Sequence, residues 1–374
     1  MKSVPTKKTH VFGAVLFSAA MALPASYSAF AEAAPERGIV AFKYLNYQDS
    51  QPDQDRIGVN AYSVMVMTPI AGKWAINSSY TYDSVSGASP TNHDTLSGAS
   101  IEERRNAGDL SVTRYLEKGS MTIGTSYSSE SDYKSHSYSF QRSFLTEDNN
   151  TTFTLGGSYT DDTINAYKKD VYDKKKRIYS GFLGVTKVLT KQDIVQLNVG
   201  FSKGDGYFSD PYKYLDLRPD KRDVTTLLTR WNHHFDASDG TVRLGYRYYT
   251  DSFDISAHTF SAEYVQPLPH ELTVTPLLRF SSQSAAYFYK PVSPHPVDPS
   301  IVLTSPSSLD ERLSAFGAVT VGLKVEKKVA ADWTVDVKFE QYEQRGEWCL
   351  TGKGDSGLQP FSFRSIQLGV SRQL

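Results

Sequence analysis

Few residues of this sequence have the types and spacing that catalysis or metal binding requires. Its eight histidines are scattered along the chain. His233 and His234 are neighbours, so on a strand their side chains point to opposite faces and cannot share a metal ion. His93 and Asp94 are also adjacent, which is not the geometry of an acid–base pair. The sequence therefore predicts no catalytic residue, no metal site and no cofactor, and it favours a protein that is not an enzyme.

Charged side chains instead recur at alternate positions of otherwise apolar segments. In the segment 241–249, for example, Arg243 and Arg247 alternate with Val242, Leu244 and Tyr246. If these segments are strands that enclose a pore, the charges lie on its inner face, where rings of charge can select ions. The same charges can instead pair across strands and leave the lumen plugged. The candidate lumen charges are Arg230, Arg243, Arg247, Arg279, Lys324, Glu326, Asp336, Lys338 and Glu340.

The last fourteen residues, 361–374, indicate that the segments with alternating charges are strands that span a membrane. From Ile366 onward, apolar residues alternate with polar or small ones, as in a strand with one apolar side. Arg372 is set into the apolar side near the chain end, where its long side chain can extend to lipid headgroups. The same ending recurs upstream, which places these strand ends at one membrane interface: Val112-x-Arg114-x-Leu116, Phe140-x-Arg142-x-Phe144, Val185-x-Lys187-x-Leu189 and Val325-x-Lys327-x-Val329.

About sixteen candidate strands follow one another, joined alternately by short and long connections. Even strand number, short periplasmic turns and longer external loops are typical of bacterial outer-membrane barrels. The predicted fold class is therefore all-β, a transmembrane antiparallel up-and-down β-barrel. The alternative is a secreted β-sandwich, whose strands average only about 5–6 residues. The expected strands are 39–47, 59–70, 74–83, 108–116, 120–128, 133–145, 151–160, 177–189, 193–202, 223–235, 241–250, 253–268, 271–282, 312–329, 333–344 and 361–374.

The N-terminal segment has the composition of a secretory signal peptide. Lys2, Lys7 and Lys8 precede an apolar stretch, 11–22, and Ala29-Phe30-Ala31 supplies a small-residue cleavage site. We expect residues 1–31 to be removed and 32–374 to form a single outer-membrane β-barrel domain. An aromatic content of 13% fits girdles at two interfaces, and a net charge of −1 gives no indication of nucleic-acid binding.

One long polar segment, 84–105, is a candidate constriction loop. It carries two SGAS sequences, whose small side chains allow close packing against an inner wall, and it ends in a charged cluster. Long connections without secondary structure are often functional. An ordinary solvated external loop is the alternative. The candidate constriction residues are Ser86, Gly87, Ala88, Ser89, Asp94, Glu102, Glu103, Arg104 and Arg105.

A resemblance adds to these observations. The segment DSVSGASP at 83–90, the second SGAS at 97–100, the charged cluster at 102–105 and the DNNTT run at 148–152 together resemble an uncharacterised family of Gram-negative outer-membrane proteins. That family is defined by a domain of unknown function, and the similarity runs over nearly all of the mature chain. It implies a signal peptide, an outer-membrane barrel and a genomic association with periplasmic flavin-attachment and redox proteins. It supplies no activity and no catalytic residue.

A barrel of about sixteen strands is wide enough for an aqueous lumen. We therefore expect a porin-like channel or exporter for small polar solutes or a partner segment, in the outer membrane of a Gram-negative bacterium after cleavage near Ala31. The alternative is a non-conducting structural barrel that scaffolds a periplasmic redox or flavin-associated complex or a surface complex. Expected partners are outer-membrane lipid, the barrel assembly machinery through the C-terminal strand and, under the scaffold hypothesis, periplasmic redox or flavin proteins.

Overall fold

The computed structural model describes residues 33–374 apart from 53, 88–100, 167–169, 214 and 292–302. The predicted signal peptide lies outside this range. The described chain forms sixteen strands and two short 3-10 helices, η3 (Glu311–Leu313) and η4 (Gly346–Trp348). The strands are β1 (Ile39–Gln51), β2 (Gln54–Ile70), β3 (Trp74–Gly87), β4 (Ile101–Leu116), β5 (Gly119–Ser129), β6 (Tyr133–Leu145), β7 (Thr151–Ile164), β8 (Lys174–Val188), β9 (Asp193–Gly206), β10 (Lys221–Phe235), β11 (Gly240–Asp251), β12 (Ser256–Leu268), β13 (Leu272–Gln283), β14 (Phe316–Ala330), β15 (Trp333–Arg345) and β16 (Phe361–Gln373).

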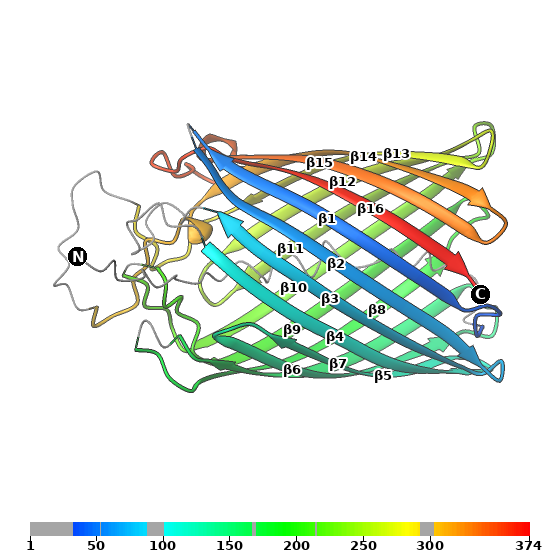
Figure 1. Cartoon of the computed structure of the whole chain (residues 1–374), viewed down its shortest axis with the longest axis horizontal. Coiled ribbons are helices and arrows are strands. Elements are labelled where there is room, and N and C mark those ends of the chain that lie inside the picture. Colours follow the sequence, from blue (N-terminus) through cyan, green and yellow to red (C-terminus); the bar gives the residue numbers. More distant parts are fainter. Residues whose placement is uncertain (1–32, 53, 88–100, 167–169, 214, 292–302) are drawn as a thin grey trace, which may run out of the picture.

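Each strand pairs antiparallel with its neighbours in sequence, and β1 pairs with β16 to close the ring. Figure 1 shows the tilted strands enclosing one barrel, with short turns and the C-terminus at one end and the longer loops at the other. The fold class predicted from the sequence is thus confirmed. Among the described residues, no helix is both long and apolar enough to cross a membrane.

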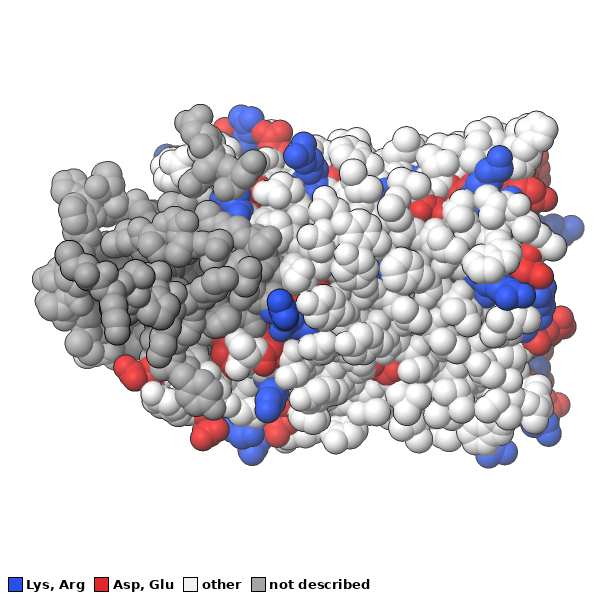
Figure 2. Space-filling view, in the orientation of Figure 1, with Lys and Arg blue, Asp and Glu red and all other residues white. Residues whose placement is uncertain are grey.

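The outer face of the barrel is apolar between two charged ends. Figure 2 shows a broad band of uncharged residues with Lys, Arg, Asp and Glu gathered on either side. Large apolar side chains such as Ile123, Leu183 and Leu278 point outward and are more than half exposed. An apolar outer band, even strand number and short turns at one end are the properties of outer-membrane barrels. This chain is a barrel of that type.

Basic residues at the short-turn end lie against aromatic rings. The Arg372 guanidinium lies 5.4 Å from the ring centroid of Trp333 on the adjacent strand. Arg114 lies 5.2 Å from the ring of Trp74 in the same way. Cation–π contacts of this kind suit a membrane interface, where one end of the pair is apolar and the other is hydrated. They define the rim on that side.

Several strand boundaries predicted from the sequence are wrong by more than one residue, and all of these lie at the long-loop end. Strands β1 and β2 continue past residue 47 as a polar hairpin, and β4 begins at Ile101 rather than residue 108. These extensions were missed because strands that project beyond a membrane need no apolar face. Conversely, residues 253–255 and 312–315 precede β12 and β14 rather than belonging to them. Their apolar side chains are buried within loops, and in the sequence they resemble the alternating apolar residues of a strand.

The outward and inward faces of β8 should tolerate charge differently. Leu183 faces outward in the apolar band, whereas Ser180 faces the lumen. We expect Leu183→Arg to lower the free energy of unfolding in lipid vesicles by roughly 2–4 kcal/mol, because a guanidinium near the midplane loses its hydration. The matched Ser180→Arg variant should cost much less. Urea titration of both barrels measures the difference, and equal destabilisation would contradict the assignment of the two faces.

Candidate functional site

All nine candidate lumen charges belong to the inward-facing set of their strands. The exposed apolar residues mark the outward positions, for example Leu244 on β11 and Val337 on β15. Because side chains alternate across a strand, the residues between them face inward. Register between neighbouring strands then places Arg230, Arg243, Arg247 and Arg279 on the wall of β10–β13, and Lys324, Glu326, Asp336, Lys338 and Glu340 on β14–β15.

The charges on β14–β15 form a balanced cluster. The Nζ of Lys324 lies 2.6 Å from Glu326 Oε2, and the Nζ of Lys338 lies 3.1 Å from Glu340 Oε1. The Asp336 side chain covers Gly369 of β16, since a Cβ added to Gly369 would lie only 2.3 Å from Asp336 Oδ1. Gly369 pairs on its other side with Lys43 of β1, whose side chain is buried. Lys43 was not among the predicted lumen charges, although it stands between the aromatic residues Phe42 and Tyr44. Three lysines thus match three carboxylates, and the cluster is a structural part of the wall.

The arginines on β10–β13 are not balanced in this way. Arg243 Nη1 lies 3.8 Å from Glu263 Oε2 on β12. The other three, Arg230, Arg247 and Arg279, form no ion pair with any residue that the structure describes. This arginine patch (Arg230, Arg243, Arg247 and Arg279) leaves an excess of positive charge on one side of the lumen.

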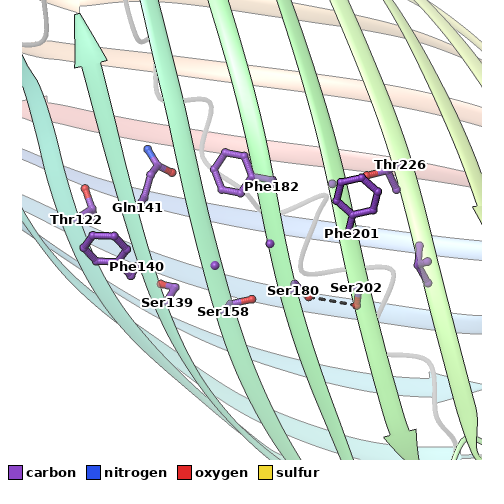
Figure 3. A pocket seen from close by; sticks show the side chains of 14 residues that line it. Thr122, Ser139, Phe140, Gln141, Ser158, Ser180, Phe182, Phe201, Ser202 and Thr226 are labelled. Carbon is purple, nitrogen blue, oxygen red and sulfur yellow. Dashed lines mark hydrogen bonds between the residues drawn. The ribbon is translucent and has the colours of Figure 1, made fainter.

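The opposite character is found on the inner wall of β5–β9, which is lined by small hydroxyl side chains. Ser139, Ser158, Ser180 and Ser202 lie in one row across β6–β9, and the Ser180 hydroxyl donates to Ser202 Oγ at 3.2 Å. Figure 3 shows this serine row with the ring of Phe182 beside it. These residues border a hollow of about 440 Å³ that no charged side chain lines. This face was not predicted from the sequence, although the alternating serines at 135, 137 and 139 could have indicated it.

The candidate constriction residues do not form one loop. Ser86 and Gly87 end β3, and Glu102 to Arg105 begin β4, with Ser86 paired to Glu102. Arg104 follows the outward set, so it does not face the lumen, whereas Arg105 pairs with Asp83 of β3 at 2.7 Å and is buried. Ala88, Ser89 and Asp94 lie outside the described residues.

The sequence analysis missed a folded cap at the long-loop end. We use this name for residues 207–220 between β9 and β10 together with residues 303–315 before β14. Its centre is Asp310, whose side chain is fully buried. Arg218 Nη2 donates to Asp310 Oδ2 at 2.7 Å, Arg312 Nε donates to Oδ1 at 2.9 Å, and Lys213 Nζ lies 4.0 Å away.

Three of the five carboxylates in the cap form ion pairs with its three cations. Asp216 accepts from Arg218 Nε at 2.8 Å, and Asp210 accepts from Arg312 Nη2 at 2.5 Å. Burial alone would raise the pKa of Asp310, but the Arg312 guanidinium and the other two cations outweigh it and hold that pKa well below its usual range. Asp310 therefore stays ionised at neutral pH, and its ion pairs bind the two loops to each other.

Neighbouring loops extend the cap across the barrel mouth. The Tyr212 hydroxyl donates to Asp132 between β5 and β6, and the Tyr289 hydroxyl donates to Asp355 between β15 and β16 at 2.5 Å. Sixteen strands tilted by about 40° and spaced ~4.8 Å apart enclose a ring about 30 Å across. Tyr212 and Arg218 are separated by at most about 20 Å of chain. The β5–β6 and β13–β14 connections lie on opposite sides of this ring, so these contacts link loops across the opening.

Apolar packing supports the same loops from β11–β12. Phe253 and Phe288 contact edge to face with ring centroids 5.0 Å apart. Ile255, Tyr289 and Leu313 join them in a buried cluster, so the residues between β11 and β12 are part of the support. Contacts among loops this far apart in sequence leave no local pattern, which is why no signal in the sequence could reveal them.

Comparison with known families now bears on this architecture. A family model matches residues 13–100, 92–173 and 168–365, which together cover almost the whole chain. The chain belongs to the family described as a protein of unknown function, DUF3570. The resemblance drawn from the sequence motifs, to a family defined by a domain of unknown function, is thereby confirmed. No curated protein matches this DUF3570 chain in sequence.

Solved structures similar to this DUF3570 barrel are also outer-membrane barrels, at very low sequence identity. A bacterial polysaccharide outer membrane secretin aligns with a TM-score of 0.49 and 6% identity, covering 90% of this chain and 98% of the other. Pseudomonas aeruginosa OccK2, solved with glucuronate, aligns with a TM-score of 0.47 and 10% identity, covering 92% and 99%. A Pseudomonas aeruginosa FadL homologue gives 0.41 and 9%, covering 90% and 89%. At this level the likeness concerns the fold alone.

The described part of the DUF3570 chain holds no group of three or more His, Cys, Asp and Glu side chains placed to bind a metal ion. His233 and His234 are directed to separate partners, Asp193 and Thr241, at 2.8 and 3.2 Å. The features of the site are therefore the arginine patch, the hydroxyl-lined hollow and the cap.

Removing the central carboxylate should loosen the cap. In Asp310→Asn, Arg218, Arg312 and Lys213 lose their common partner in a buried place, which is strongly unfavourable. We expect faster hydrogen exchange in residues 207–220, measured by mass spectrometry, with the exchange of the β-strands unchanged. Asp239→Asn, in an exposed turn at the other end, is the matched control. Because the pKa of Asp310 is lowered in the folded cap, its contribution is present above the unfolded pKa of ~3.9. The wild-type cap should therefore stay protected from hydrogen exchange at pH 5, and loss of protection at that pH would contradict the central role of Asp310.

Proposed function

We propose that this barrel is an outer-membrane channel for small polar solutes, with the cap narrowing its mouth. The main support is the inner wall, on which arginines without acidic partners share the lumen with rows of hydroxyl groups. Unpaired charges inside a dry barrel would cost several kcal/mol each. A water-filled lumen removes that cost and gives solutes a polar surface to follow.

The cap supports a selective channel rather than a wide pore. Its loops are held by buried ion pairs and a packed aromatic cluster, so they limit the size of what enters. A partner segment such as a polymer or peptide needs a wider passage than a small solute. We therefore favour small solutes over a partner segment, which the sequence left open.

The non-conducting scaffold remains the second candidate because a cap across the mouth also suits a closed barrel. Under that hypothesis the short-turn end would contact periplasmic redox or flavin proteins. Recognition of β16 by the barrel assembly machinery stays a prediction in both cases. It is compatible with the position of β16 at the seam, where it pairs with β1.

Planar-bilayer recording tests the channel directly. Purified full-length barrel should give steady single-channel currents, and the double variant Arg218→Gln/Arg312→Gln should raise the conductance because the cap loses two of its three cations. Arg177→Gln, at an exposed outward position of β8, is the control and should leave the conductance unchanged. A correctly folded wild-type barrel that stays silent, and is still silent after the cap variant, would contradict the channel. Copurification with periplasmic proteins would then favour the scaffold.

A further inference from the structure

We propose that the arginine patch on the inner wall of β10–β13 is a binding site for the oxyanion group, carboxylate or phosphate, of a small hydroxylated solute. The inference deepens the channel function proposed above and rests on it for the route by which the solute arrives. The site itself is argued from the register, the packing and the charges of the wall.

Register brings the four arginines around one small area. Arg230 pairs with Gly245, Gly245 with Ser261 and Ser261 with Arg279, so these residues form one row across four strands. The two ends of that row are about 14 Å apart at a strand spacing of ~4.8 Å. Arg243 and Arg247 lie two residues to either side of Gly245, about 7 Å along the strand. Long side chains from all four positions can therefore reach a common ligand.

The middle of the row is made of small residues. A Cβ placed on Gly245 would approach Ser261 Oγ to 2.6 Å, so the glycine leaves the serine hydroxyl uncovered. Gly245 and Ser261 thus form a low floor between the arginines, with one hydroxyl donor in it. A larger residue at either position would fill the space that an oxyanion needs.

The charge of the patch also favours an anionic ligand. The patch has four guanidinium groups and one neighbouring carboxylate, Glu263, which pairs with Arg243 at 3.8 Å. Arg230, Arg247 and Arg279 pair with no described acid, although the cluster on β14–β15 shows that this wall can supply one acid for each cation. Guanidinium groups bind carboxylate and phosphate through two parallel hydrogen bonds. Like charges held together without partners are the arrangement that an anionic ligand would stabilise.

The rest of the ligand can be inferred from the wall directly beside the patch. Thr259 of β12 pairs with Arg247, and Ser281 of β13 pairs with Thr259, so two hydroxyl side chains adjoin the arginines. Together with Ser261 they offer hydroxyl groups within about 7 Å along the strands of the row that begins at Arg230. These groups suit the hydroxyl-bearing body of a sugar acid or a sugar phosphate.

Calorimetry with the purified barrel in detergent micelles tests the site without requiring conduction. Gluconate and glucose 6-phosphate are the anionic probes, and sorbitol is the neutral probe of similar size. We expect saturable binding of at least one anion and none of sorbitol. Arg230→Gln/Arg247→Gln should weaken anion binding at least tenfold, whereas Lys187→Gln, an outward residue near the rim, should not. Arg247→Lys keeps the charge but loses the two-pronged contact, so its effect should be intermediate.

The outcomes separate this inference from the channel proposal. A silent barrel that still binds gluconate through Arg230 and Arg247 would support the site and contradict the channel. A conducting barrel whose anion binding is unchanged in the double variant would overturn the site alone. Equal binding of sorbitol and gluconate would also overturn it, since charge would then play no part. Unchanged heat-modifiable mobility on gels confirms that each variant is folded.

Discussion

Every backbone N–H and C=O inside a bilayer must find a partner in the protein, and this requirement governs the whole structure. Fifteen of the strand pairings in this barrel join neighbours in sequence, but the sheet keeps two open edges until β1 pairs with β16. That last pairing runs from Ile39↔Gln373 to Ser50↔Ser362. The Arg37 guanidinium, which donates to the Leu374 carbonyl oxygen at 3.0 Å and pairs with Asp332 at 2.6 Å, fixes the seam at its end.

Closure of the barrel also determines which residues face the lumen and can contact a solute. Once the register is set, alternation sends one half of each strand to lipid and the other half to the lumen. Slipping β11 by one residue against its neighbours would turn Arg243 and Arg247 to the lipid and bring Leu244 inside. The functional wall is therefore a consequence of the register, and the register is specified by the apolar outer face.

Much of this was accessible from the sequence because the membrane imposes a simple periodicity. The succession of alternating segments with short and long connections predicted about sixteen strands, and alternation within segments such as 241–249 predicted the inward position of the arginines. The hairpin at Gln51 and Gln54 was missed, since polar residues on both faces give no periodic signal outside the membrane. The cap was missed for a different reason. Asp310 and Arg218 are separated by 92 residues, and nothing local in either segment predicts their contact.

The cap and the arginine patch use the same side chain under opposite conditions, and the comparison supports a hydrated lumen. In the cap, the fully buried carboxylates Asp216 and Asp310 are both paired with cations, Asp216 with Arg218 and Asp310 with Lys213, Arg218 and Arg312. On the wall of β10–β13, Glu263 is the one described carboxylate that pairs with any of the four arginines, and Arg243 is about half exposed. Desolvating an ion without a partner is costly, so balance is expected wherever water is excluded. An unbalanced set of charges is stable only where water or an anion reaches it. The imbalance on the wall is thus the observation that favours the proposed water-filled lumen over a packed core.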